Sequence, residues 1–262
     1  MTRPFLLLTN DDGIHAPGIK HLWQAVHEYA DVAIVAPLIE KSGCGLSITW
    51  GKPLKVHPVN WENNTSAWSL TGTPADCVKM ALAVLLKRKP DLVISGINRG
   101  SNSGRTALYS GTIGGVIEGA MKGIQGIAFS FSDYETTPSV NVTKQYILAL
   151  IDHFINDPLP PETILNVNFP YHCEKKIKGI RLAKQGKGHW VEDPDRRIHP
   201  EGLPYYWLGG RWRSFEEEPD SDVTLLEQGY ITAVPLQIGQ LTHFEVFLTH
   251  KERIQEKLNT IS

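Results

Sequence analysis

Phe5-Leu6-Leu7-Leu8-Thr9-Asn10-Asp11-Asp12-Gly13 places a run of apolar residues directly before two adjacent acids and a glycine. Four apolar residues bounded by turn-forming residues predict a short, buried β-strand. The two acids then lie where a parallel strand ends and the chain turns towards a helix. In open α/β sheets, ligands bind at that edge.

The adjacent carboxylates of Asp11 and Asp12 indicate a cation site. Two such groups repel each other unless a cation or a shared proton lies between them. Hard oxygen donors at a strand end favour one divalent ion, Mg²⁺ or Mn²⁺. The alternative is that Asn10 or Asp11 only caps the following helix.

Strand and helix patterns alternate through the first two thirds of the chain. Helical spacing of apolar residues is found over 19–26, 78–86, 113–121 and 147–154. Further strands are predicted at Val32–Ala36, Leu92–Ser95, Ile127–Phe131 and Ile164–Asn168. Repeated βα units with buried strands predict a Rossmann-like, three-layer α/β/α core with a mostly parallel sheet.

Two segments interrupt this alternation and define the expected domain organisation. Residues 1–185 form the predicted core, within which about 47–70 is a small hairpin insertion. Residues 186–262 form a predicted C-terminal extension, in which Ile231–Val234 and Phe244–Leu248 have strand character and a short polar helix follows from Lys251. Its aromatic cluster favours a minor core or a subunit contact over stacking of a base: Trp190, Tyr205, Tyr206, Trp207 and Trp212.

Composition excludes several classes of protein. The chain has 262 residues, 41% hydrophobic and 21% charged, which suits one globular α/β domain with an extension. A formal net charge of −2 gives no electrostatic case for nucleic acid binding. Cys44, Cys77 and Cys173 are too scattered for a zinc site or a disulfide framework. Without a signal peptide or an apolar membrane span, we expect a cytoplasmic protein.

Polar loops after the predicted strands carry the remaining chemistry. Asn98 and Ser42 supply neutral oxygens that complement the two acids around a hard cation. Ser110, Gly111 and Thr112 open a helix, where hydroxyls, free N–H groups and the helix dipole favour a phosphate. A metal beside a phosphate site predicts phosphoryl transfer or phosphate-ester hydrolysis. The alternative is that these loops are ordinary turns and Ser110 or Thr112 an N-cap.

Several common motifs are missing from the sequence. There is no GxxxxGK[ST], no GxGxxG and no GxSxG, which disfavours a P-loop protein, a dinucleotide dehydrogenase and an α/β-hydrolase.

The same loops resemble the SurE family of metal-dependent nucleotidases. The matching strings follow one another in the family order over most of the chain: Thr9–Ile14, Val35–Pro37, Ser42-Gly43, Gly72–Val78, Ser95–Asn98 with Gly100 and Asn102, Tyr109–Thr112, Asn166–Pro170 and Gly229–Thr232 with Pro235-Leu236. The resemblance implies hydrolysis of nucleoside 5′- or 3′-monophosphates.

The resemblance also implies residue roles. The metal ligands match Asp11, Asp12, Ser42 and Asn98, and the phosphate contacts match Gly43, Asn102, Ser110, Gly111 and Thr112. Family members form dimers or tetramers by exchanging a C-terminal segment, which implies a homodimer or homotetramer. One departure is that Cys44-Gly45-Leu46 replaces a small residue followed by Ser and Asn, which puts the nucleotide preference in doubt.

These roles predict metal-assisted hydrolysis at phosphorus, with Asp11, Asp12 and Asn98 as catalytic residues. The cation would activate a water, Asp11 would orient or deprotonate it, and Asn102, Thr112 and the Gly111 N–H would stabilise charge on phosphate oxygens. Covalent attack by an Asp is the less favoured variant. Two other functions remain open: a broad phosphatase or short-chain polyphosphatase using the same site, and a nucleotide sensor without turnover.

Overall fold

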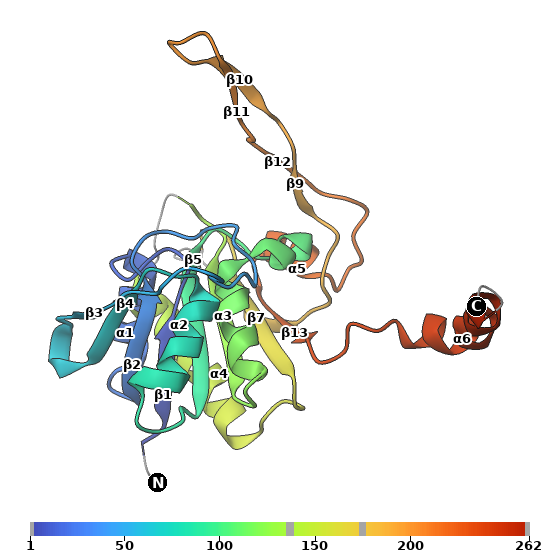
Figure 1. Ribbon diagram of the computed structural model, residues 1–262. Helices are drawn as coiled ribbons and strands as arrows, with labels where there is room; N and C mark the ends of the chain where they lie inside the picture. The colour runs from blue at the N-terminus through green and yellow to red at the C-terminus, as the bar shows by residue number, and fades with distance from the viewer. Residues whose placement is uncertain (1–2, 135–138, 173–176, 260–262) are drawn as a thin grey trace.

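The computed structural model describes residues 3–134, 139–172 and 177–259. Within them, a nine-stranded sheet runs in the order β3-β4-β2-β1-β5-β6-β7-β13-β8 (Figure 1). Its strands are β1 (Phe5–Thr9), β2 (Asp31–Pro37), β3 (Val56–Val59), β4 (Ser66–Leu70), β5 (Leu92–Arg99), β6 (Gln125–Phe131), β7 (Thr163–Phe169), β8 (Ile180–Leu182) and β13 (Ile231–Gln237).

Parallel pairing dominates this sheet. Six consecutive strands, β4, β2, β1, β5, β6 and β7, pair with one another in parallel. Antiparallel pairing is found where β3 meets β4 and where β13 meets β7. The mostly parallel α/β sheet predicted from the sequence is therefore confirmed.

Helices cover both faces of the sheet and complete three layers (Figure 1). On one face α1 packs against α4, and on the other α2 packs against α3. The helices and short helical turns of the core are α1 (Pro17–Val26), η1 (Glu62–Asn64), α2 (Pro74–Met80), η2 (Ala81–Leu85), η3 (Gly104–Tyr109), α3 (Gly111–Ala120) and α4 (Val140–Asn156).

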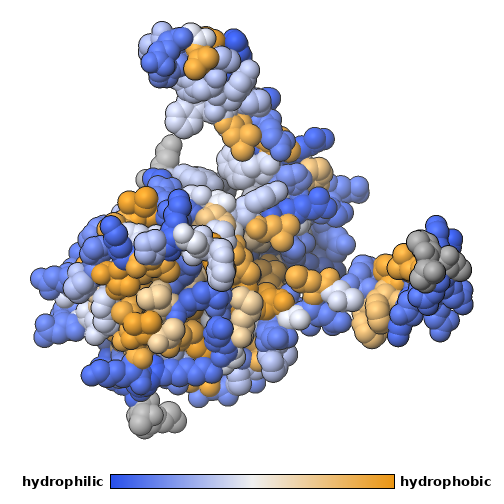
Figure 2. Space-filling model, in the orientation of Figure 1, coloured by the Kyte–Doolittle hydropathy of each residue, from blue (hydrophilic) through white to orange (hydrophobic). Residues whose placement is uncertain are grey.

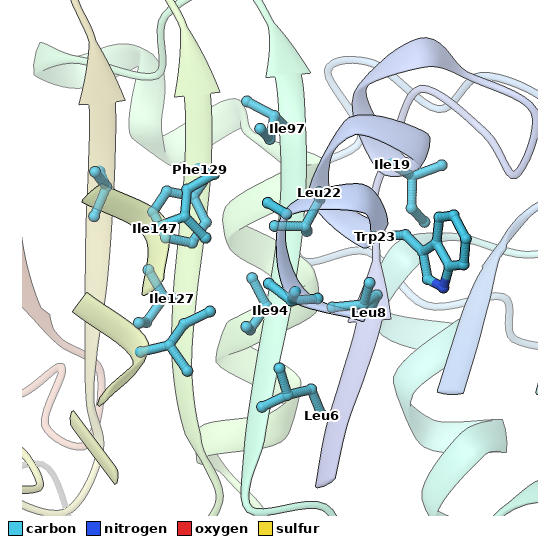
Figure 3. Packing of buried hydrophobic residues seen from close by; sticks show 14 of the residues in the cluster. Leu6, Leu8, Ile19, Leu22, Trp23, Ile94, Ile97, Ile127, Phe129 and Ile147 are labelled. Atoms are coloured by element: carbon cyan, nitrogen blue, oxygen red, sulfur yellow. The ribbon is translucent and has the colours of Figure 1, made fainter. Parts of the chain in front are cut away.

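Alternation along β1 divides the core into two clusters. Leu6 and Leu8 face α1 and α4, where Leu22, Ile147 and neighbouring residues enclose them (Figure 3). Leu7 points to the opposite face, against residues of α2 and α3. All three leucines are fully buried. This period-2 pattern on a strand buried on both faces is what the continuous apolar run predicts.

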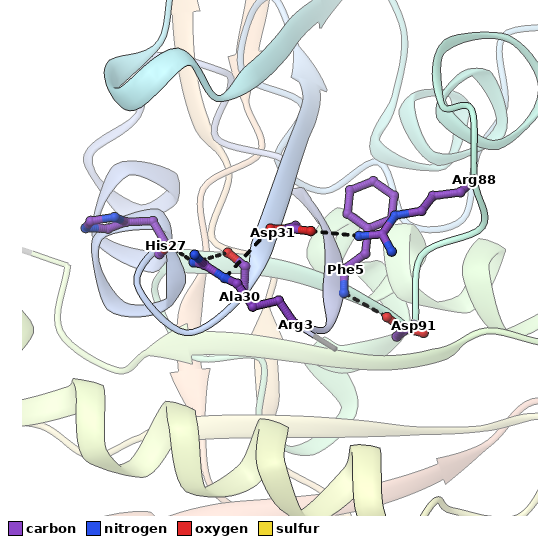
Figure 4. Close-up of polar contacts among 7 residues, drawn as sticks. All are labelled: Arg3, Phe5, His27, Ala30, Asp31, Arg88 and Asp91. Carbon is purple, nitrogen blue, oxygen red and sulfur yellow. Dashed lines mark hydrogen bonds and ion pairs between the residues drawn. The ribbon is translucent and has the colours of Figure 1, made fainter. Parts of the chain in front are cut away.

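Polar contacts fix the amino-terminal ends of the strands, at the edge opposite the predicted site (Figure 4). The Arg3 guanidinium donates to the carbonyls of His27 and Ala30, at 2.6 and 3.0 Å. The Phe5 N–H donates to the Asp91 carboxylate at 2.7 Å, just before β5 begins.

The predicted hairpin insertion is confirmed, but it is part of the main sheet. β3 and β4 pair with each other, and β4 also pairs in parallel with β2. The hairpin therefore extends the sheet at one edge.

The C-terminal region differs from the sequence-based description in two ways. First, β13 lies inside the main sheet between β7 and β8, because its buried residues from Ile231 to Val234 pack against the core. Second, Phe244–Leu248 is not a strand: it begins the helix α6 (Phe244–Asn259). Apolar residues at 244, 247 and 248 fit helical spacing as well as strand spacing over so short a run.

The aromatic segment forms a long two-stranded arm that projects from the body (Figure 1). Its pairs are β9 with β12 and β10 with β11. The remaining elements are β9 (His189–Val191), β10 (Asp195–Ile198), β11 (Pro204–Trp207), β12 (Arg211–Arg213) and α5 (Asp222–Glu227). Tyr205, Tyr206 and Trp207 are exposed on this arm, so the chain itself provides no minor core for them.

Candidate functional site

The predicted site residues converge on one cleft of about 410 Å³ at the carboxyl edge of the sheet. Seven of the nine line it: Asp11, Asp12, Ser42, Gly43, Asn98, Asn102 and Ser110. Gly111 and Thr112 do not line the cleft. They are buried at the start of α3, where they contact Asp11. The structure therefore brings together residues from four loops that are far apart in the sequence.

A side-chain turn at Asn10 places the two acids. The Asn10 amide donates to the Gly13 carbonyl at 2.9 Å and accepts from the Gly13 N–H at 3.2 Å. Gly13 has a φ of 102°, a conformation that favours glycine. The N-cap of α1 is Ala16, which makes no side-chain capping bond. The alternative that Asn10 or Asp11 only caps a helix is therefore wrong.

Asp11 is buried and held by the start of α3. The Thr112 hydroxyl donates to Asp11 Oδ1 at 2.5 Å. Burial raises the pKa of Asp11, while the bonds from the Thr112 hydroxyl and from backbone N–H groups lower it in part. A Cβ at Gly111 would lie 2.8 Å from the Asp11 Cβ, so only glycine allows this close approach.

Asp12 lies in the cleft beside Asp11. Burial, and then the Asp11 charge, raise the pKa of Asp12 from 3.8 to about 6. The Arg99 N–H donates to Asp12 Oδ2 at 3.3 Å, which opposes this effect. Two crowded carboxyl groups with raised pKa values are the electrostatic condition that a bound cation relieves.

The two predicted neutral ligands lie on the loops on either side of the acids. Ser42 donates to Glu40 Oε1 at 2.7 Å, and Glu40 also lines the cleft. The Asn98 amide nitrogen donates to the Gly100 carbonyl at 2.7 Å, so the amide oxygen is the end left to face a cation. The pairing of β5 with β6 shifts register between Ser95 and Asn98, so the regular hydrogen bonding of the two strands is interrupted just before Asn98.

The donor set suits a hard divalent cation. Two carboxylates, a hydroxyl and an amide oxygen are the ligand types that Mg²⁺ and Mn²⁺ prefer. Over the described ranges, no three histidine, cysteine, aspartate or glutamate side chains are grouped so that they could hold a metal ion. The site therefore has the composition of a mixed-oxygen centre and lacks the donors of a structural zinc site.

A buried asparagine network holds Asn102, one of the predicted phosphate contacts. The Asn102 N–H donates to Asn168 Oδ1 at 2.8 Å, and the Asn102 amide donates to Ser130 Oγ at 2.8 Å. The Asn166 amide donates to the Asn102 carbonyl at 2.9 Å. The sequence analysis gave Asn166 and Asn168 no role of their own. Their spacing of two residues near the end of β7 places both on one face of the strand, and this was the signal that could have indicated it.

Ser110 has a structural role as well as its place in the cleft. Its hydroxyl accepts from the Ile113 N–H at 3.2 Å, so it is the N-cap of α3. The capping alternative is thus correct for Ser110. A phosphate contact by the same residue stays a prediction.

Sequence reasoning also missed Glu40, Arg99 and Tyr134, which line the cleft. Trp190 lines it too, although the aromatic cluster was assigned to a minor core or a subunit contact.

Of the cysteines, the structure describes Cys44 and Cys77, and neither has a lowered thiol pKa that would favour a nucleophile. Burial raises the pKa of Cys44 and raises that of Cys77 well above its ordinary value. Cys173 lies outside the described residues.

None of the helices in the described ranges has the length and apolar character needed to cross a membrane.

Comparisons with known proteins identify relatives of this chain. A family model described as Survival protein SurE matches residues 6–192. The chain is 48% identical over 259 residues to a Protochlamydia amoebophila protein named 5′-nucleotidase SurE, covering 98% of this chain and 97% of that protein. A Christiangramia forsetii protein of the same name is 41% identical over 243 residues, covering 92% and 94%.

A solved structure has the same fold. The crystal structure of the SurE protein from Aquifex aeolicus superposes with a TM-score of 0.80 at 36% sequence identity, covering 95% of this chain and 99% of that one.

Proposed function

This chain belongs to the Survival protein SurE family, and on that premise we propose that it is a divalent-metal-dependent 5′-nucleotidase. It hydrolyses nucleoside 5′-monophosphates, and nucleoside 3′-monophosphates, to nucleoside and phosphate. The names of its curated relatives support nucleotidase activity. The observation that carries the metal dependence is that Asp11 and Asp12 line one cleft with Asn98 and Ser42.

Asp11, Asp12, Ser42 and Asn98 would hold one divalent ion, Mg²⁺ or Mn²⁺. When bound, such an ion polarises a phosphate oxygen and lowers the pKa of a coordinated water.

The protein's own groups supply the rest of the mechanism. Asp11 orients the attacking water or accepts its proton, and the Thr112 hydroxyl keeps this carboxylate in one orientation. Asn102, which lines the cleft, stabilises the negative charge that grows on the phosphate oxygens. The asparagine network holds Asn102 in place for that role.

Phosphate release tests this proposal. The protein is treated with a chelator, and release from nucleoside 5′- and 3′-monophosphates is measured before and after Mg²⁺ or Mn²⁺ is restored. We expect release that requires the metal and favours nucleotides over an aryl phosphate or a short polyphosphate. Asp11→Asn and Asp12→Asn should abolish release and metal binding while the protein stays folded. Tight nucleotide binding without release under any metal would support a sensor instead.

We also propose that the chain forms a homodimer or homotetramer. The helix α6 has no buried residue, yet Phe244, Phe247 and Leu248 lie on it and are exposed. Figure 2 shows this region standing apart from the body with hydrophobic residues on its surface. An unpartnered apolar helix of this kind is best buried against a second copy of the chain.

Sedimentation of the full chain tests the assembly. We expect a dimer or tetramer, and a Phe247→Asp variant should shift it towards the monomer. Thr249→Asp, at an exposed position on α6 away from the ring of Phe247, adds the same charge and is the control. A wild-type protein that sediments as a monomer at micromolar concentration would exclude this proposal. The cytoplasmic location stays a prediction from the sequence.

A further inference from the structure

A second pocket lies directly beside the cleft and is walled by aromatic rings. It has a volume of about 200 Å³, and Tyr134, Tyr171, Trp190 and Trp212 line it. We call it the aromatic pocket. Ser101, Tyr134 and Trp190 line both this pocket and the cleft with the two acids, so the two spaces share one wall.

The rings of the aromatic pocket pack edge to face. The ring centroids of Tyr134 and Trp190 are 6.4 Å apart at an interplanar angle of 86°. Those of Trp190 and Trp212 are 6.1 Å apart at 73°. Such pairs are favourable beyond their buried area. Tyr134 and Trp190 nevertheless remain 46% and 47% exposed, so their ring faces are accessible to a ligand.

The backbone of the loop over residues 98–102 supports one wall of this pocket. A Cβ at Gly100 would lie 2.4 Å from the Tyr134 ring, and Gly100 has a φ of 104°. Both facts require glycine there, and the short distance places Tyr134 against the loop that carries Asn98 and Asn102. The pocket therefore lies directly against the loop that carries these predicted metal and phosphate ligands.

Buried carboxylate contacts support the other wall, at the base of the arm. The two oxygens of Asp222 accept from the Gly104 and Gly186 N–H groups at 2.9 and 2.8 Å. The Gly188 carbonyl accepts from the Arg105 N–H at 2.9 Å. These bonds tie the segment before Trp190 to η3, next to the cleft.

We propose that the aromatic pocket binds the base of the nucleotide and so sets the preference for nucleotides over other phosphate esters. This proposal rests on the proposed function, since it requires the phosphate to lie in the cleft. A base is flat and aromatic. It stacks on exposed aromatic rings whichever polar groups it carries, because every base has a π-face. The Glu227 carboxylate also lines the pocket and accepts hydrogen bonds from base N–H groups.

The other neighbouring space fits a base less well. It has a volume of about 480 Å³ and shares Asp12, Glu40 and Arg99 with the cleft. Its apolar wall is mainly aliphatic, with Leu38 and Ile39, and its one aromatic ring besides His15 is the buried Phe131. The aromatic rings on which a base could stack therefore lie mainly in the aromatic pocket, which contains Trp190.

The decisive experiment compares a nucleotide with a phosphate ester that has no base. Adenosine 5′-monophosphate is the substrate, and ribose 5-phosphate is measured as a competing ligand through its inhibition constant. In Trp190→Ala we expect KM for the nucleotide to rise about 10-fold or more, the range that loss of one stacking ring produces. The inhibition constant of ribose 5-phosphate should stay unchanged, and kcat should change little.

Two further variants serve as controls. Trp190→Phe keeps an aromatic face and should restore most of the affinity. Trp207→Ala removes an equally large ring, 65% exposed on the same arm and outside the pocket, and should leave KM unchanged. An unchanged KM in Trp190→Ala would overturn the proposal. So would an equal effect of Trp207→Ala, or equal losses for the nucleotide and ribose 5-phosphate.

Failure of the proposed function gives a different result. If the wild-type protein releases no phosphate with any metal, that function fails, whatever the pocket binds. The pocket is then tested by calorimetric binding of adenosine 5′-monophosphate, which Trp190→Ala should weaken and Trp207→Ala should not.

Discussion

The hydroxyl of Thr112, the second residue of α3, donates a 2.5 Å hydrogen bond to Oδ1 of Asp11 at the end of β1. The two residues are 101 positions apart in the chain. Both are buried, so this bond is made away from solvent and fixes the orientation of the carboxylate. The sequence predicts Thr112 as a phosphate contact, which stays a prediction; its hydroxyl is bonded to Asp11, a predicted metal ligand.

Thr112→Val should therefore weaken metal binding. The variant keeps the shape of the side chain but removes the hydroxyl, and a hydrogen bond to a charged group contributes about 1.5–3 kcal/mol. We expect Mn²⁺ affinity to fall roughly 10-fold and turnover to fall with it. Calorimetry of Mn²⁺ binding measures this, with Thr112→Ser as the matched control that retains the hydroxyl. A loss of phosphate affinity with full Mn²⁺ affinity would contradict this assignment.

The stability of the metal-free protein should depend on Asp12 between about pH 4 and 6. The pKa of Asp12 is raised from 3.8 to about 6, so the folded state binds a proton more tightly than the unfolded state. This contribution to stability is present below pH 3.8 and is lost as pH rises through about 6.

Thermal unfolding in a chelating buffer measures this effect. Asp12→Asn stays neutral at every pH, so its Tm should exceed that of the wild type by a margin that grows to roughly a few degrees by pH 7. Added Mg²⁺ or Mn²⁺ should remove the difference by stabilising the wild type. A difference in Tm that does not vary with pH would argue against the raised pKa.

Asn168→Ala should destabilise the loop that carries Asn102. Asn168 Oδ1 accepts from the Asn102 N–H at 2.8 Å, and the substitution leaves this buried donor without its partner. The expected cost is about 1–3 kcal/mol of unfolding free energy, with a raised KM and little change in Mn²⁺ affinity. Denaturant unfolding and steady-state kinetics measure the two effects. Asn156→Ala, at the exposed end of α4, is the control and should change neither.

Cys77→Ser should lower stability without affecting catalysis. Cys77 is fully buried in the cluster formed by α2 and α3, and burial raises the pKa of its thiol. A hydroxyl placed there without a good partner costs about 1–3 kcal/mol. Chemical unfolding should show this loss, and the kcat of the folded protein should be retained. A large fall in kcat would show that Cys77 has a role in the reaction.

The sequence predicted the elements whose signals are local. β1 follows from four apolar residues before a turn, and α1 from apolar residues at helical spacing, because both patterns act over a few residues. The convergence of Asp11, Ser42 and Asn98 was also predictable, since loops that follow parallel strands project from the same edge. Phe244–Leu248 was misassigned because five residues do not distinguish a strand from the first turn of a helix.

By itself, then, the sequence determined the layered α/β sheet, the loops at its carboxyl edge and the acidic pair that begins the site. Only the tertiary structure decided which side chains touch there. In the structure the Thr112 hydroxyl bonds to Asp11, β13 lies within the main sheet, and the ring of Trp190 packs against that of Tyr134. The reason is that strand and turn formation depends on neighbouring residues, whereas a contact between distant residues exists only after the sheet has brought their loops together.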